Sequence, residues 1–138
     1  MEGKVWVQVC STAVVEGQKD ILRESGKGRL DREENGWRLR YVAHNEAGEK
    51  SQFDIHLHSG EAAIRNCLGG YTMYLRPGQI TRAPVATAYG TIELCLQGRS
   101  LSWMLEGKET GEVQFEYTLL SNGQEISHMT VAIQLSKE

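Results

Sequence analysis

The sequence is poor in proline and cysteine, and the scarcity of cysteine argues against a small domain held together by disulfides or by a cysteine-ligated zinc ion. Only two of the 138 residues are proline and three are cysteine. The cysteines, Cys10, Cys67 and Cys95, are odd in number and far apart, and no CxxC spacing occurs. Neither a disulfide framework nor a zinc motif is therefore indicated. We expect reduced thiols and a cytoplasmic location.

Long apolar runs and a surplus of basic residues are also missing. No stretch approaches the roughly 18 apolar residues of a membrane helix. The start of the chain leads from Lys4 directly into an alternating segment, so we expect no secretory signal. The formal net charge of -3 argues against a dedicated nucleic-acid-binding protein, which usually carries a basic face. We therefore expect neither nucleic acid nor a membrane as a partner.

What the sequence does contain is alternation of apolar and polar residues with a period of two. The alternating runs cover 5–10, 37–41, 53–57, 92–96, 101–105, 113–119 and 129–135. Such runs bury one face of a strand and favour antiparallel pairing. Residues 19–28 lack a helical period, and Gly26 and Gly28 indicate a bent strand there. We predict one all-β domain over residues 1–138, an antiparallel sandwich or barrel of about eight strands.

Turn residues between the runs agree with this interpretation. Asn35-Gly36 and Asn122-Gly123 lie between alternating segments and predict hairpins, because Asn and Gly tolerate positive φ. Near Gly98 the apolar residues change from even to odd positions. A bulge at Gly98 explains this change, and so does a tight hairpin over 97–100. We favour the bulge.

The order of short motifs in the second half is similar to a known family. The motifs are Ala63-Ile64-Arg65, Met73-Tyr74-Leu75, Thr87-Ala88-Tyr89-Gly90 and the strand from Gly111 to Leu119. In this order they resemble the YwiB-like family of small bacterial proteins, a domain-of-unknown-function family. The resemblance implies a calycin-like β-barrel, related in shape to lipocalins. It implies no activity and no functional residue.

The sharpest chemical pattern lies on one predicted strand. Asp54, His56 and His58 alternate, so their side chains share a face, and imidazole and carboxylate are good zinc ligands. A metal site needs a further ligand or an open water position, and one strand supplies no more than these three. We interpret the face as solvated and predict no tight divalent metal. No nucleophile motif or phosphate loop occurs, so we assign no catalytic residue, expect no cofactor and consider an enzyme less favoured.

The interior of the barrel is the remaining candidate site. An eight-stranded barrel is either filled by side chains or wide enough for one small ligand. Two hypotheses follow: a non-catalytic module that binds a small apolar or amphipathic ligand inside, or an accessory protein that acts through its outer surface. The oligomeric state stays open. We expect any internal site near Trp103 and Tyr117, and the candidate lining residues are Tyr41, Met73, Trp103, Phe115 and Tyr117.

Overall fold

The computed structural model describes residues 1–138 and contains ten β-strands without a helix. Every hydrogen-bonded pair of strands is antiparallel, as predicted. The count is ten rather than about eight, because the segment after β4 folds into three short strands with little alternation. The strands are β1 (Gly3–Val15), β2 (Gln18–Glu33), β3 (Gly36–His44), β4 (Lys50–His58), β5 (Glu61–Asn66), β6 (Tyr71–Leu75), β7 (Ile80–Thr87), β8 (Gly90–Met104), β9 (Thr110–Ser121) and β10 (Gln124–Lys137).

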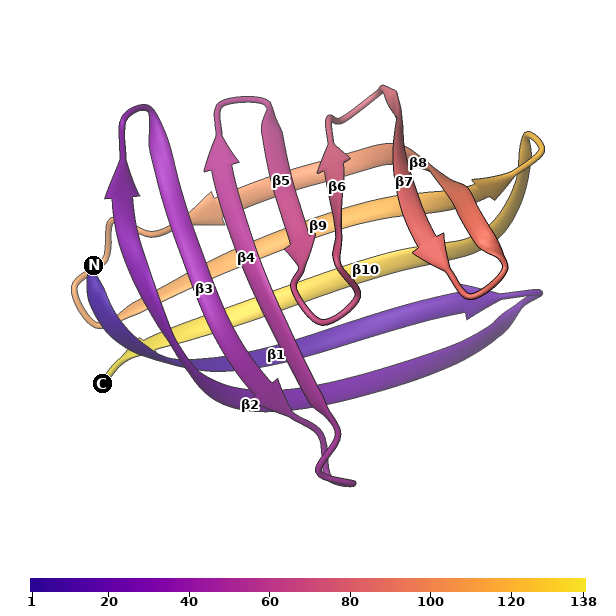
Figure 1. Cartoon of the computed structure of the whole chain (residues 1–138). Coiled ribbons are helices and arrows are strands. Elements are labelled where there is room, and N and C mark those ends of the chain that lie inside the picture. Colours follow the sequence, from indigo (N-terminus) through magenta and orange to yellow (C-terminus); the bar gives the residue numbers. More distant parts are fainter.

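The ten strands form one sheet that curls into a nearly closed barrel. Their order is β6-β5-β4-β3-β2-β1-β10-β9-β8-β7. The two edge strands approach each other, since the Thr81 hydroxyl on β7 donates to the carbonyl of Tyr74 on β6. Figure 1 shows β3–β6 crossing in front of β8–β10, while β2 bends from one layer to the other. This near closure leaves little free edge for pairing with other chains.

Both predicted hairpins are confirmed, with one difference in the role of a glycine. Asn35 has φ 66° and Asn122 has φ 52°, the left-handed values that such turns need. Gly36, however, is the first residue of β3 and does not have a positive φ. A Cβ at Gly36 would lie 1.8 Å from the carbonyl oxygen of Leu57. The glycine is therefore needed for the close approach of β4 rather than for the turn.

The predicted bulge in β8 is confirmed as well. The register between β8 and β9 shifts between Gly98 and Ser100, so Arg99 is the extra residue. Strand β8 runs unbroken from Gly90 to Met104. Because one added residue reverses the alternation, Leu96 and Leu105 are both buried despite their different parity.

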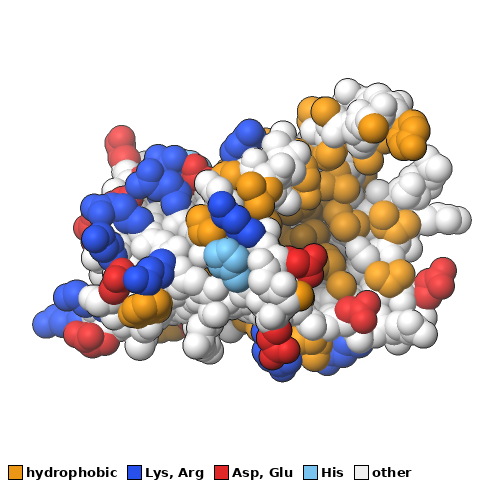
Figure 2. Space-filling view, turned by 60° about the horizontal axis from the view of Figure 1, so that its bottom comes forward, with side chains coloured by type: hydrophobic (Ala, Val, Ile, Leu, Met, Phe, Trp, Pro, Cys, Tyr) orange, Lys and Arg blue, Asp and Glu red, His pale blue; other side chains and the backbone are white.

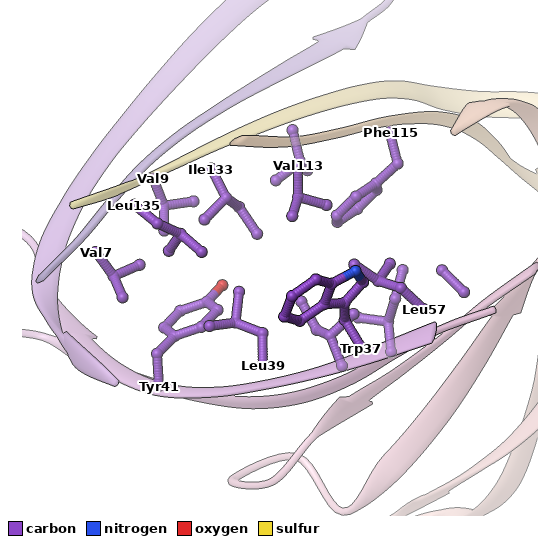
Figure 3. Packing of buried hydrophobic residues seen from close by; sticks show 14 of the residues in the cluster. Val7, Val9, Trp37, Leu39, Tyr41, Leu57, Val113, Phe115, Ile133 and Leu135 are labelled. Atoms are coloured by element: carbon purple, nitrogen blue, oxygen red, sulfur yellow. The ribbon is translucent and has the colours of Figure 1, made fainter. Parts of the chain in front are cut away.

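The core lies between the two layers. Figure 3 shows side chains of β1, β9 and β10 facing side chains of β3 and β4. Twenty-two buried residues form this hydrophobic cluster, and each fully buried aliphatic side chain contributes roughly 1.5–3 kcal/mol to folding. The structure has no helix of the length and apolar character required to cross a membrane.

Candidate functional site

One end of the barrel contains a cavity that the core does not fill. Its volume is about 210 Å³, and twelve of its 15 lining residues are hydrophobic. The lining comes from both layers, with Val9 on β1 and Val131 on β10 opposite Tyr41 on β3 and Ile55 on β4. The cavity is therefore a continuation of the barrel interior past the packed core.

Two aromatic pairs form much of the cavity wall. The rings of Tyr41 and Phe53 stack with centroids 5.7 Å apart, across neighbouring strands β3 and β4. The rings of Phe115 and Tyr117 stack along β9 at 6.2 Å, because residues two apart on a strand share a face. Aromatic pairs of this kind contribute about 0.5–1.5 kcal/mol beyond the area that they bury, so they help to hold this wall together.

Several polar groups interrupt the apolar lining, namely Glu24, Ser11, Ser51 and the hydroxyls of Tyr41, Tyr71 and Tyr117. Tyr41 and Tyr117 are buried, and burial raises the pKa of the Tyr117 hydroxyl to about 12. Burial also raises the pKa of Tyr41, and the charge of Glu24 adds to that effect. Both hydroxyls therefore stay protonated at neutral pH. Glu24 accepts a hydrogen bond of 2.5 Å from the Ser51 hydroxyl.

The two buried tyrosines differ from a third that lines the cavity. The Tyr71 hydroxyl accepts a hydrogen bond of 3.3 Å from the Asn66 amide, whereas Tyr41 and Tyr117 have no hydrogen-bond partner in the protein. Figure 3 shows the Tyr41 oxygen pointing from β3 across the interior. Two neutral hydroxyl donors are thus available to a molecule in the cavity.

Apolar side chains lie at the mouth of the cavity. Figure 2 shows a hollow with a hydrophobic floor on this face of the molecule. Leu22 on β2 lines the cavity and remains exposed, and Met129 on β10 is half-buried beside it. Further exposed apolar side chains lie on the hairpins that extend past the cavity, namely Val15, Ile21, Tyr89, Ile92 and Ile126.

The structure brings together four of the five residues proposed from the sequence. Tyr41, Met73, Phe115 and Tyr117 all line the cavity. Trp103 lies elsewhere, in a surface depression with Trp37 and Leu101. Its partner on β9 is Val113, four residues from Tyr117 and roughly 13 Å along the strand. The alternation correctly predicts that these aromatic side chains lie on the inner faces of their strands. It does not predict how far along the barrel axis each one lies.

Sequence reasoning also left out several lining residues. Phe53 shares a face with Ile55 and Leu57, so the alternation alone would have included it. Leu22 and Glu24 continue the inward parity of Leu30 on β2, but the glycines between them obscured that pattern. No sequence signal pointed to the contact of Glu24 with Ser51.

A second polar group of residues lies outside the barrel, on β3 and β4. Arg38 donates two hydrogen bonds to Asp54, from Nε to Oδ1 at 3.0 Å and from Nη2 to Oδ2 at 2.7 Å. These hydrogen bonds from Arg38 lower the pKa of Asp54. His56 and His58 share this outer face, as predicted, while Ile55 and Leu57 are buried. Glu33 from β2 joins the histidines, with Oε1 2.9 Å from His56 Nδ1.

A second histidine network joins β9 and β10. His128 Nε2 lies 2.5 Å from Glu116 Oε2, and its Nδ1 lies 3.2 Å from the Thr118 hydroxyl. Ser100 contacts the other oxygen of Glu116 at 3.5 Å and does not contact the imidazole. A nucleophile needs a base within hydrogen-bond reach, so this network positions strands rather than activating a serine.

Comparison with known proteins gives a family and a fold. A family model described as "Domain of unknown function (DUF1934)" matches residues 7–133. The crystal structure of the YwiB protein from Bacillus subtilis is similar, with a TM-score of 0.77 and 18% sequence identity over 99% of this chain and 94% of that chain. At that identity the likeness concerns the fold. No curated protein gives a significant match.

Proposed function

This chain belongs to the DUF1934 family, in agreement with its YwiB-like motifs, and on that premise we propose that it binds a small amphipathic molecule in the cavity at the end of its barrel. The observation that carries the proposal is an apolar cavity lined by two tyrosines, Tyr41 and Tyr117, whose hydroxyls have no hydrogen-bond partner within the chain, unlike that of Tyr71. Apolar walls with a few convergent polar groups are typical of small-molecule sites. The family description names no activity, so the argument comes from this cavity alone.

The size and charge of the cavity define the ligand class. The cavity volume of about 210 Å³ is below the roughly 300–1,000 Å³ of common ligand pockets. The part of the ligand that the cavity encloses is therefore a single ring or a short chain. A ligand with a longer aliphatic chain would extend out of the cavity past Leu22. The carboxylate of Glu24 repels an anionic group at the same end. We therefore favour a neutral or cationic polar group that accepts hydrogen bonds from the tyrosines or donates one to Glu24.

The four methionines provide a direct test with an internal control. Met73 and Met129 line the cavity, whereas Met1 and Met104 do not. The protein carrying 13C-methyl methionine would be titrated with medium-chain alcohols, single-ring aromatic amines and the matching carboxylic acids. We expect shifts of the Met73 and Met129 signals with alcohols or amines, weaker shifts with the acids, and no change at Met1 or Met104. Shifts confined to Met104, or none with any compound, would contradict the proposal.

A second candidate function has its own observation. The Tyr89 side chain is fully exposed at the tip of the β7–β8 hairpin, and Ile92 beside it is half exposed. Exposed apolar residues that gather on hairpin tips are typical of interaction surfaces. If the protein acts through this surface, the double substitution Tyr89→Ser with Ile92→Ser should abolish self-association. The ligand-induced shifts of the Met73 and Met129 signals should stay unchanged. Analytical ultracentrifugation across a concentration series would measure self-association.

The cellular location forms part of the same proposal. All three cysteines are free thiols and half-buried. Free thiols persist in a reducing compartment, which supports a cytoplasmic protein that meets a metabolite rather than an extracellular lipid. Quantitative thiol labelling of the protein in intact cells, followed by mass spectrometry, would measure the redox state of the three cysteines. Complete labelling of the three cysteines after denaturation without reductant is the expected result.

A further inference from the structure

Three side chains meet on the outer face of the barrel beside the β2–β3 hairpin. Glu33, His56 and His58 each offer a donor atom, and these atoms lie within 4.8 Å of one another. The Glu33 Oε1 atom lies 2.9 Å from His56 Nδ1 and 3.9 Å from His58 Nε2. Both imidazoles therefore approach the same carboxylate oxygen.

The sheet register explains why a residue of β2 reaches β4. Glu33 is paired with Gly36 on β3, and Gly36 is paired with His58 on β4, so the three lie in one row across the sheet. Because Gly36 has no side chain, the Glu33 side chain can cross β3 to the histidines. A Cβ at Gly36 would lie 3.1 Å from the His58 ring nitrogen Nδ1. The same glycine that admits β4 also opens the path for Glu33.

A second carboxylate orients one of the imidazoles. His56 Nε2 lies 3.5 Å from Asp54 Oδ1, on the side of the ring opposite Glu33. Asp54 is itself held in place by two hydrogen bonds from Arg38. In the metal-free chain Nδ1 donates to Glu33, because a carboxylate only accepts. When the proton lies on Nε2 instead, beside Asp54, the Nδ1 lone pair is free to bind a metal ion. This carboxylate–imidazole arrangement is the one that supports histidine ligands in metal sites.

From this geometry we propose that Glu33, His56 and His58 bind a divalent transition-metal ion of the zinc class. Two imidazoles and one carboxylate are a common zinc ligand set, and three protein ligands leave a fourth position for water or another small ligand. The ligand side chains are 29%, 34% and 45% exposed, so an ion can enter from solvent. At Zn–N distances of about 2.0–2.1 Å, tetrahedral donors lie about 3.4 Å apart. Rotation of the partly exposed Glu33, His56 and His58 side chains can bring the donor atoms from their present separations to this distance.

The sequence alone predicts no tight metal, because a single strand supplies every ligand that its pattern shows. Glu33 comes from a different strand, 23 residues earlier than His56. A metal ion bound here would link β2 to β4 across β3. The site shares no residue with the internal cavity, so it is independent of the function proposed above.

The test is zinc binding by the full chain, measured by isothermal titration calorimetry and by metal analysis after dialysis. We expect one equivalent of Zn²⁺ per chain. Glu33→Gln should weaken binding at least tenfold, and His56→Ala with His58→Ala should abolish it. Glu116→Gln is the matched control, because Glu116 also contacts a histidine, His128, at 2.5 Å but has no second imidazole beside it. That control should bind zinc with unchanged affinity.

Two further readouts separate this site from other ways of holding zinc. Long-range 1H–15N spectra should show zinc bound to His56 through Nδ1, with the proton on Nε2. Asp54→Asn should weaken binding about 10-fold through loss of that orienting contact. Thermal unfolding without metal establishes that each variant is folded. Zinc bound through cysteine thiolates, binding unaffected by Glu33→Gln, or no stoichiometric binding would overturn the proposal.

Discussion

The hydroxyls of Tyr41 and Tyr117 lie among apolar side chains with no protein partner, in contrast to the Tyr71 hydroxyl. Removing either hydroxyl therefore leaves no other group unpaired. For Tyr41→Phe and Tyr117→Phe we expect the free energy of unfolding to change by less than about 1 kcal/mol, while ligand affinity falls about 5-fold. Urea unfolding and the methionine titration measure the two quantities. Tyr74→Phe, exposed on β6, is the control, and an equal loss of affinity there would contradict the assignment.

Asp54 gives a prediction about pH at the same scale. The hydrogen bonds from Arg38 lower the pKa of Asp54 below its ordinary value of 3.8. A carboxylate with a lowered pKa in the folded state stabilises the protein above the pKa of the unfolded chain. That contribution is lost as pH falls through the lower, folded-state pKa. The unfolding free energies of wild type and Asp54→Asn should therefore differ at pH 7 and converge toward pH 2.

Urea denaturation at both pH values measures this difference. Asp20→Asn serves as the control, since Asp20 is exposed on β2 and forms no ion pair. Its stability should match wild type throughout. A difference for Asp54→Asn that persists unchanged at the lowest pH would show that the Arg38 pair is not the cause.

At the scale of whole elements, alternation and turn chemistry predicted most of the fold. The hairpins at Asn35 and Asn122, the bent β2 and the bulge near Gly98 are local features, so the sequence carries them directly. Strands β5, β6 and β7 are short, so each carries only a few alternating residues, and their number was underestimated. The position of Trp103 along the barrel and the meeting of Glu33 with His56 depend on strand register across the sheet, which local sequence patterns do not carry.

Gly36 tests how strongly one residue controls the β2–β3–β4 unit. In Gly36→Ala the new Cβ would meet the Leu57 carbonyl oxygen at 1.8 Å, a backbone atom that cannot rotate away. We expect a loss of unfolding free energy on the order of 2 kcal/mol, since overpacking in a sheet forces the backbone to shift. Gly111→Ala is the comparison, because its nearest neighbour is the Leu105 side chain at 3.0 Å. Urea denaturation should give Gly36→Ala a much lower unfolding free energy than Gly111→Ala. Equal stability of the two variants would refute the steric argument.

For the whole molecule, the barrel divides into a filled half and a half that holds the cavity. Val113 belongs to the filled half and is completely buried, whereas Val131 lines the cavity on the neighbouring strand β10. The same substitution should therefore have opposite consequences at the two positions. Val131→Phe places its ring in existing space, while Val113→Phe must displace packed atoms at a cost of about 1–3 kcal/mol.

We expect Val131→Phe to keep its unfolding free energy within about 1 kcal/mol of wild type and to lose the ligand-induced shifts of Met73 and Met129. Val113→Phe should be the less stable variant and should still bind, because its ring lies outside the cavity. Urea denaturation and the methionine titration, applied to both proteins, distinguish the two halves. Equal destabilisation of both variants, together with no ligand-induced shift in the wild type, would mean that the interior is packed throughout, and the protein would then act through its outer surface.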